Sequence, residues 1–119
     1  MKGLDVYKET TVSTQNKGRL IVMLYEGAIR FLRQAIRDLE AKDYTGKGRN
    51  IQRALDIIYE LNTVLNMEAG GEISHNLRVL YNFATRHLTQ ANTQCDAQMI
   101  HEVITILEEL NQGWRAATS

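Results

Sequence analysis

The side chains that could carry chemistry in this sequence are few, and the most suggestive spacing among them is the E-x-x-H motif formed by Glu72 and His75. In helical bundles, two such motifs and two further inward-facing glutamates can hold a pair of metal ions. The sequence has no second copy of the motif. Steps of 100° along a helix also place His75 roughly opposite the apolar stripe of its helix. We therefore expect His75 to face solvent and to bind no metal.

The remaining reactive residues also lack the neighbours that catalysis requires. His87 falls at the edge of an apolar stripe, a position typical of a hydrogen-bonded structural histidine. Cys95 has no activating motif beside it. The segment TGKGRN, residues 45–50, lacks the spacing of a phosphate-binding loop and is predicted to be a flexible loop. No nucleophile is paired with a base, so the sequence predicts no catalytic residue, no metal, no cofactor and no enzymatic activity.

The charge pattern argues against a nucleic-acid-binding protein. Arg30, Arg33 and Arg37 could form a basic stripe on one helix, but acidic residues such as Glu26 and Asp38 interrupt it. Fourteen basic residues balance fourteen acidic ones over the whole chain. A neutral chain has no overall attraction for polyanions. We expect this stripe to be a solvated face.

The sequence also favours a cytoplasmic protein with no direct membrane insertion. Its longest apolar run is far shorter than the roughly 20 residues that cross a bilayer. The first ten residues lack the apolar core of a signal peptide. The single cysteine cannot form an internal disulfide, which fits a reducing compartment.

Apolar residues with helical periodicity, separated by turn-forming segments, predict an all-α protein. The expected helices cover residues 14–41, 49–69, 73–91 and 97–116. Gly70 suits the left-handed position after the second helix, and Asp96 suits the N-cap of the fourth. Helices joined by short loops pack as an antiparallel up-down four-helix bundle. We expect one domain over residues 1–119, with residues 1–12 as an N-terminal capping segment.

The helices carry more apolar surface than the core of a bundle requires, which is about three of every seven positions. Six apolar residues lie outside or at the border of the main stripes: Val22, Met23, Ile57, Val64, Val79 and Phe83. Scattered apolar residues are normal on surfaces, and residues 1–12 could cover some of them. The third interpretation is a hydrophobic groove for a partner helix.

Several segments together resemble one protein family. They are LIVMLYEGAIRFL (20–32), IQRALDIIYELNTVLN (51–66), GGEISHNLRVLYNF (70–83), LTQAN (88–92) and LNQGW (110–114), preceded by YKETTVSTQ (7–15). In this order, and over nearly the whole chain, they resemble the flagellar export chaperone family FliS.

The resemblance implies a non-enzymatic cytoplasmic chaperone with an antiparallel helical bundle and an N-terminal cap. Such a protein binds the C-terminal segment of flagellin, prevents premature polymerisation and assists delivery to the flagellar type III export gate. A regulator or co-chaperone is a further possible partner. The expected partner-binding residues are then Tyr7, from the N-terminal segment, and the six surplus apolar residues. The alternative is a self-associating bundle that uses its extra apolar surface as a homodimer interface.

Overall fold

The structure is a computed structural model that describes residues 14–66 and 71–118. The described residues form four α-helices, which are α2 (Thr14–Glu40), α3 (Tyr44–Asn66), α4 (Glu72–Gln94) and α5 (Ala97–Thr118). The predicted cap segment 1–12, Tyr7 within it and the predicted helix end at Gly70 lie outside the described residues.

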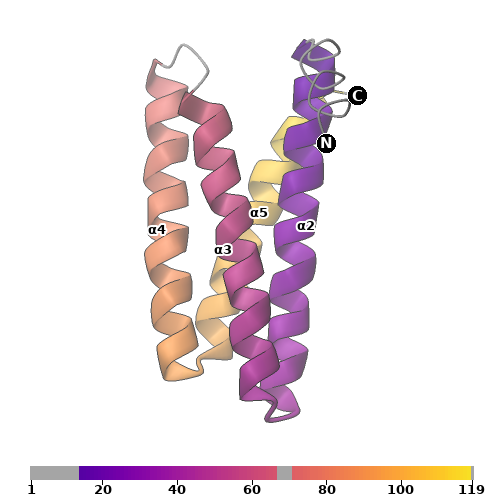
Figure 1. Cartoon of the computed structure of the whole chain (residues 1–119). Helices are drawn as coiled ribbons and strands as arrows, with labels where there is room; N and C mark the ends of the chain where they lie inside the picture. Colours follow the sequence, from indigo (N-terminus) through magenta and orange to yellow (C-terminus); the bar gives the residue numbers. More distant parts are fainter. Residues whose placement is uncertain (1–13, 67–70, 119) are drawn as a thin grey trace, which may run out of the picture.

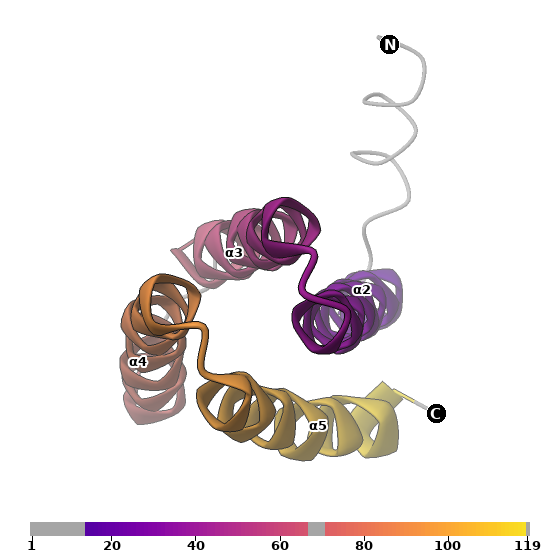
Figure 2. The same ribbon diagram turned by 90° about the horizontal axis from the view of Figure 1, so that it is seen from below.

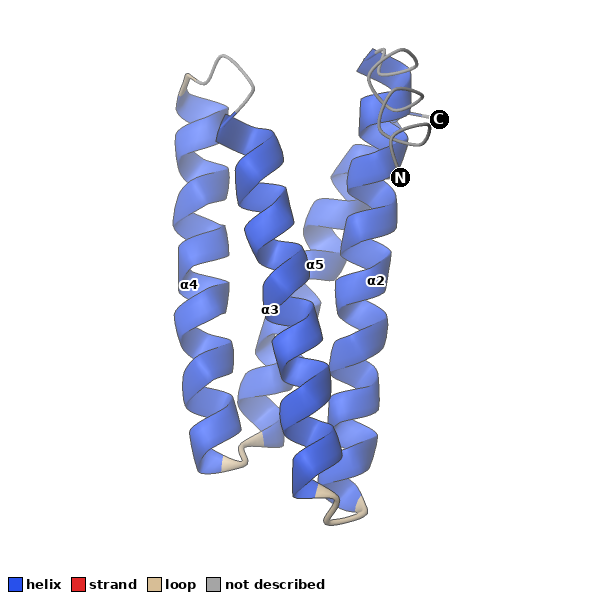
Figure 3. Ribbon diagram, viewed as in Figure 1, coloured by secondary structure: helices blue, strands red, loops and turns tan. Residues whose placement is uncertain are grey.

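The helices are antiparallel to their neighbours and form a ring, which Figure 2 shows from one end. In this ring α2 packs between α3 and α5, and α4 packs between α3 and α5 on the opposite side. Figure 1 shows α2 and α4 running in one direction and α3 and α5 in the other. Regions 14–66 and 71–118 contain only helices and short connections, and no strand (Figure 3). The predicted all-α four-helix bundle is confirmed.

The core consists of apolar side chains from one stripe of each helix. Its largest fully buried members are Tyr25 and Leu32 of α2, Ile51, Ile58 and Leu61 of α3, Leu88 of α4, and Ile100, Val103 and Leu107 of α5. Their spacing of three, four or seven residues within each helix places them on one side of it. None of the helices in residues 14–66 and 71–118 combines the length and apolar character needed to cross a bilayer.

The start of α3 differs from the sequence prediction. A flexible loop was expected over residues 45–50 and a helix from residue 49, but α3 begins at Tyr44. The loop prediction is wrong because Asp43 caps the helix: its Oδ1 accepts a hydrogen bond from the Gly46 amide at 3.0 Å. Asn50 then ties α3 to α2 by donating to Asp38 Oδ2 at 2.7 Å. These polar contacts outweigh the low helix propensity of the two glycines.

A buried lysine closes the same end of the bundle. Lys47 has only 6% of its surface exposed, and its Nζ donates to the main-chain oxygen of Asn92 at 2.8 Å and to Asn92 Oδ1 at 2.7 Å. Asn92 lies in the last turn of α4, where the carbonyl groups have no partner within the helix and favour a positive charge. The helix ends at Gln94, and its C-cap residue, Cys95, adopts a left-handed conformation with φ of 53°. Lys47 therefore joins the start of α3 to the end of α4.

The other helix limits lie closer to expectation. The fourth helix begins at Ala97, as predicted, and Asp96 caps it by accepting a hydrogen bond from the Met99 amide at 3.2 Å. The third helix was expected to end at Ala91 but continues to Gln94. Helix limits inferred from periodicity alone commonly miss such terminal turns.

Two tyrosines form a polar contact inside the core. The hydroxyl groups of Tyr25 in α2 and Tyr81 in α4 hydrogen-bond to each other, and their ring centroids are 6.4 Å apart. Burial raises the pKa of the Tyr25 hydroxyl, although hydrogen bonds with Tyr81 and Trp114 oppose the rise. Burial also raises the pKa of Tyr81, and Tyr25 adds to that effect. Both groups therefore stay protonated in the folded protein.

This tyrosine pair should make stability fall at high pH. The folded-state pKa values lie above the ordinary value of 10.0, so the contribution of the protonated pair is intact below pH 10 and is lost as pH rises further. The free energy of unfolding then falls by at most about 1.4 kcal/mol per pH unit for each tyrosine. We expect urea unfolding above pH 10 to show a shallower loss of stability in the Tyr25→Phe/Tyr81→Phe double variant than in the wild type. If stability fell equally steeply with pH in both proteins, the buried tyrosine pair would not be the cause of the loss.

The glycines at the start of α3 provide a matched pair of substitutions. A Cβ atom added at Gly46 would lie 2.4 Å from Asp43 Oδ2, whereas at Gly48 the nearest atom, Asn92 Oδ1, would be 3.6 Å away. We expect Gly48→Ala to raise the free energy of unfolding by about 0.5–1 kcal/mol through helix propensity. Gly46→Ala should be about 1 kcal/mol less stable than Gly48→Ala because the Asp43 cap must move. Urea denaturation measures both, and equal stabilisation would refute the capping role.

Candidate functional site

An apolar groove lies between α4 and α5, toward the end of the bundle where α4 begins. Its volume is about 410 Å³, and it is lined by Ile73, Leu77, Glu109, Leu110, Gly113, Trp114 and Ala117. Five of these seven residues have apolar side chains, and Glu109 is the only charged residue among them. Such a surface can bury the apolar face of another polypeptide.

Two local features leave apolar surface uncovered in this groove. Ile73, in the first turn of α4, has 76% of its surface exposed, although isoleucine is among the residues most often buried. On the facing helix, Gly113 contributes no side chain, and a Cβ atom placed there would meet no other atom within 4 Å. The groove can therefore accept a side chain from another molecule at Gly113.

A small internal cavity lies next to the groove. Its volume is about 20 Å³, and it is lined by residues of all four helices: Ile21, Leu61, Val64, Leu65, Leu77, Tyr81 and Trp114. Leu77 and Trp114 line both the cavity and the outer groove. The interior is thus less closely packed at this end of the bundle, where it borders the exposed apolar surface.

Six of the seven residues predicted to bind a partner do not line this groove. Tyr7 is outside the described residues. Val22 is partly buried on α2, and Met23 beside it is exposed. Val79 and Phe83 are exposed on α4, where the Phe83 ring stacks on His87 with centroids 4.8 Å apart.

The two predicted residues of α3 are half-buried and pack against the core. Ile57 faces α2, because a Cβ atom built on Gly27 would lie 3.3 Å from Ile57 Cδ1. Val64 lines the internal cavity. The structure therefore spreads the predicted set over several faces of the bundle and does not bring it together in one site. Their role in binding stays a prediction.

Sequence reasoning missed the residues that line the groove. Leu77, Leu110 and Trp114 fit the apolar stripes of their helices, and periodicity alone places them in the core. The signal that could have identified them is Gly113, a glycine inside a helix and directly before the only tryptophan. A missing side chain beside large apolar residues indicates a close approach or an opening.

The histidines considered as candidate chemical groups are either exposed to solvent or hydrogen-bonded to a neighbouring helix. His75 is exposed, and His87 Nε2 lies 2.7 Å from Glu102 Oε1, as expected for a hydrogen-bonded histidine at the edge of the core. Among residues 14–66 and 71–118, no group of three or more His, Cys, Asp and Glu side chains is placed to hold a metal ion. The arrangement offers surfaces for another polypeptide, and we find no catalytic constellation in this part of the chain.

Comparison with known proteins gives a consistent result over the full length. The sequence model of the family described as "Flagellar protein FliS" matches residues 1–119. The chain is 38% identical over 119 residues to the flagellar secretion chaperone FliS of Vibrio cholerae, covering 96% of this chain and 88% of that protein.

Similar relatives occur in other bacteria. The protein of the same name from Salmonella typhimurium is 39% identical over 112 residues, covering 93% of this chain and 83% of the relative. That from Bacillus subtilis is 34% identical over 111 residues, covering 93% and 82%. The order of segments noted in the sequence, the four-helix bundle and these matches agree, and the chain belongs to the flagellar protein FliS family.

Proposed function

We propose that this protein is a cytoplasmic, non-enzymatic chaperone that binds the C-terminal segment of flagellin, prevents its premature polymerisation and assists its export through the flagellar type III secretion system. The observation that carries the proposal is the family match over residues 1–119 to proteins named as flagellar secretion chaperones. The apolar groove between α4 and α5 supports it, because a protein-binding chaperone requires an exposed apolar surface.

The physical requirements of such a client fit this groove. The C-terminal segment of flagellin is expected to be disordered when free and amphipathic when it forms helical contacts in the filament. A segment of that kind can fold on a partner and bury its apolar face there. We propose that Ile73 and Trp114 contact this apolar face, and that covering it removes the surface through which flagellin subunits self-associate.

Further partners belong to the same proposal. Delivery of flagellin requires contact with the flagellar export gate, and a regulator or co-chaperone could bind as well. Tyr7 and the rest of residues 1–12 are proposed to cover apolar surface in the absence of client.

The alternative function is a self-associating bundle. The same groove supports this alternative, because a second copy of the chain could cover Ile73 and Trp114. Light scattering with and without a flagellin C-terminal peptide separates the two proposals. A monomer that forms a defined complex with the peptide supports the chaperone, whereas a dimer that ignores the peptide supports the alternative.

A substitution at Gly113 tests the groove without disturbing the core. Gly113→Gln should place a side chain in the groove and weaken binding of a labelled flagellin C-terminal peptide by about tenfold or more, the effect of excluding one apolar side chain. The free energy of unfolding should stay the same or rise by about 0.5–1 kcal/mol, because glycine is a poor helix former. Fluorescence anisotropy and urea denaturation provide the two readouts.

Gly113→Ala is the matched control. It should give a similar gain in stability but leave most of the groove open, so peptide binding should change little. If Gly113→Gln binds the peptide as well as Gly113→Ala does, the groove between α4 and α5 is not part of the client surface.

The apolar character of the groove also predicts how binding responds to salt. Raising the salt concentration from low to moderate values should change the affinity for the flagellin peptide only a few-fold, because apolar burial is not screened by ions. A decline of several orders of magnitude, as seen for phosphate-binding proteins, would indicate a charged interface instead.

A further inference from the structure

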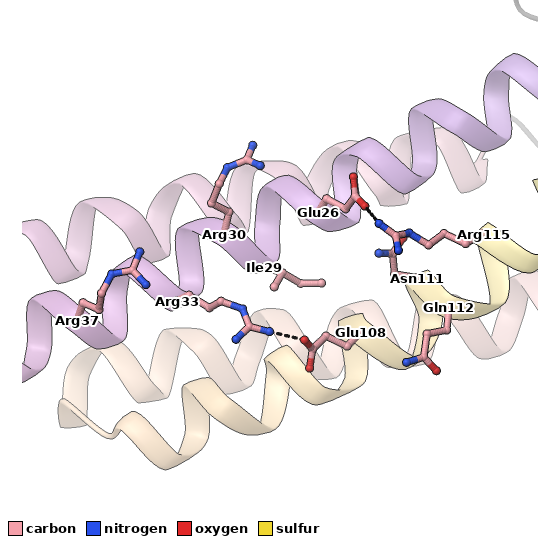
Figure 4. Close-up of a pocket in the computed structure, with 9 residues that line it drawn as sticks. All are labelled: Glu26, Ile29, Arg30, Arg33, Arg37, Glu108, Asn111, Gln112 and Arg115. Carbon is pink, nitrogen blue, oxygen red and sulfur yellow. Dashed lines mark hydrogen bonds and ion pairs between the residues drawn. The ribbon is translucent and has the colours of Figure 1, made fainter.

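A second groove, chemically different from the first, lies between α2 and α5 (Figure 4). Its volume is about 610 Å³, and it is lined by Glu26, Ile29, Arg30, Arg33, Arg37, Glu108, Asn111, Gln112 and Arg115. Four arginines and two glutamates make this a positively charged surface within a chain whose formal net charge is zero.

The two glutamates neutralise only two of the four arginines. Glu26 forms an ion pair with Arg115, and Glu108 forms one with Arg33; both pairs connect α2 to α5 (Figure 4). Arg30 and Arg37 have no carboxylate partner among the described residues.

Arg37 has only a neutral partner: its Nη2 donates to Gln34 Oε1 at 2.8 Å. Two exposed guanidinium groups on one helix therefore remain available to an anionic ligand.

The floor of the groove contains an unsatisfied acceptor. Asn111 has only 8% of its surface exposed, and its Oδ1 has no hydrogen-bond partner. This oxygen is itself buried, so it adds a local cost to stability and offers no contact to a ligand in the groove. The nearly buried Ile29 lies beside it in the groove and offers an apolar contact.

We propose that the groove between α2 and α5 binds an acidic polypeptide segment. In this arrangement two carboxylates of the partner pair with the exposed side chains of Arg30 and Arg37. Arginine suits this role because its planar guanidinium group donates two parallel hydrogen bonds to a carboxylate.

The composition of the groove favours a peptide over a nucleic acid. Glu26 and Glu108 lie in the same groove and would repel a continuous row of phosphates. None of its lining residues is aromatic, so the groove has no platform on which a base could stack. Carboxylates on a peptide are spaced apart and can reach Arg30 and Arg37 individually.

The spacing of the arginines narrows the choice of partner. Arg30 and Arg37 are seven positions apart on α2, which corresponds to about 10 Å along the helix axis. An extended peptide advances about 3.3 Å per residue, so acidic residues three positions apart span the same distance. We therefore expect the partner to be an extended segment in which two acidic residues are three positions apart.

This proposal does not rest on the proposed chaperone function. The apolar groove uses Gly113 and Trp114 of α5, whereas the basic groove uses Asn111, Gln112 and Arg115 of the same helix. One helix thus separates two surfaces of different chemistry. An acidic partner could bind while the apolar groove is occupied.

Titration with a fluorescein-labelled peptide that repeats Glu-Gly-Ser tests the proposal by fluorescence anisotropy. The wild type should bind this peptide with an affinity that falls as salt is raised, and a peptide that repeats Gln-Gly-Ser should not bind. Arg30→Gln/Arg37→Gln should weaken binding by about tenfold, as expected for two partly exposed charge pairs. Circular dichroism verifies that each variant is folded.

Arg49→Gln/Arg86→Gln is the matched control, because it removes the same charge from exposed positions on α3 and α4. It should leave the affinity unchanged. The proposal fails if both double variants weaken binding equally, since attraction would then depend on total charge alone. It also fails if the wild type does not bind the acidic peptide, or if it prefers an oligouridylate of equal length.

Discussion

Burial of one narrow apolar stripe on each helix holds this protein together. Because the stripes are narrow, the outer edges of the contacts between helices are not part of the core. Four helices in a ring share a single interior, but each pair of neighbours also meets along an outward-facing seam. The interior is filled by side chains such as Tyr25 and Leu107, whereas the seams are closed only where the local residues allow it. The differences among the seams therefore decide which surfaces are available to other molecules.

Three of these seams differ in the residues that line them. Between α2 and α3, Gly27 allows Ile57 to approach closely, and Arg53 lies over the Phe31 ring with its guanidinium carbon 5.6 Å from the ring centroid. Between α2 and α5, ion pairs bridge a wider groove. Between α4 and α5, an apolar groove remains open beside Gly113.

The sequence predicted the fold well because the core stripes repeat with the period of a helix and residue types alone reveal that repeat. It failed at the start of α3, where two glycines suggested a loop. There the structure depends on the Asp43 cap and on the bond from Asn50 to Asp38, which joins different helices. Periodicity within one helix contains no information about such a contact.

The candidate site was harder to predict for the same reason. A helical wheel shows that a residue lies at the border of a stripe, but the neighbouring helix determines whether the border is covered. Ile57 is half-buried because Gly27 of α2 lies opposite it. Trp114 fits the core stripe of α5 and yet lines an open groove, because its neighbour Gly113 has no side chain to fill the space.

The pairing of α2 with α5 also has a consequence for the folding kinetics. The ion pairs that bridge these helices join residues 75 and 89 positions apart, whereas α2–α3 and α4–α5 are connected by short turns. Contacts between distant parts of a chain form more slowly than local ones, so we expect the two hairpins to form first and the ring to close last. The walls of the basic groove would then come together only in the final folding step, and a partly folded chain would lack that surface.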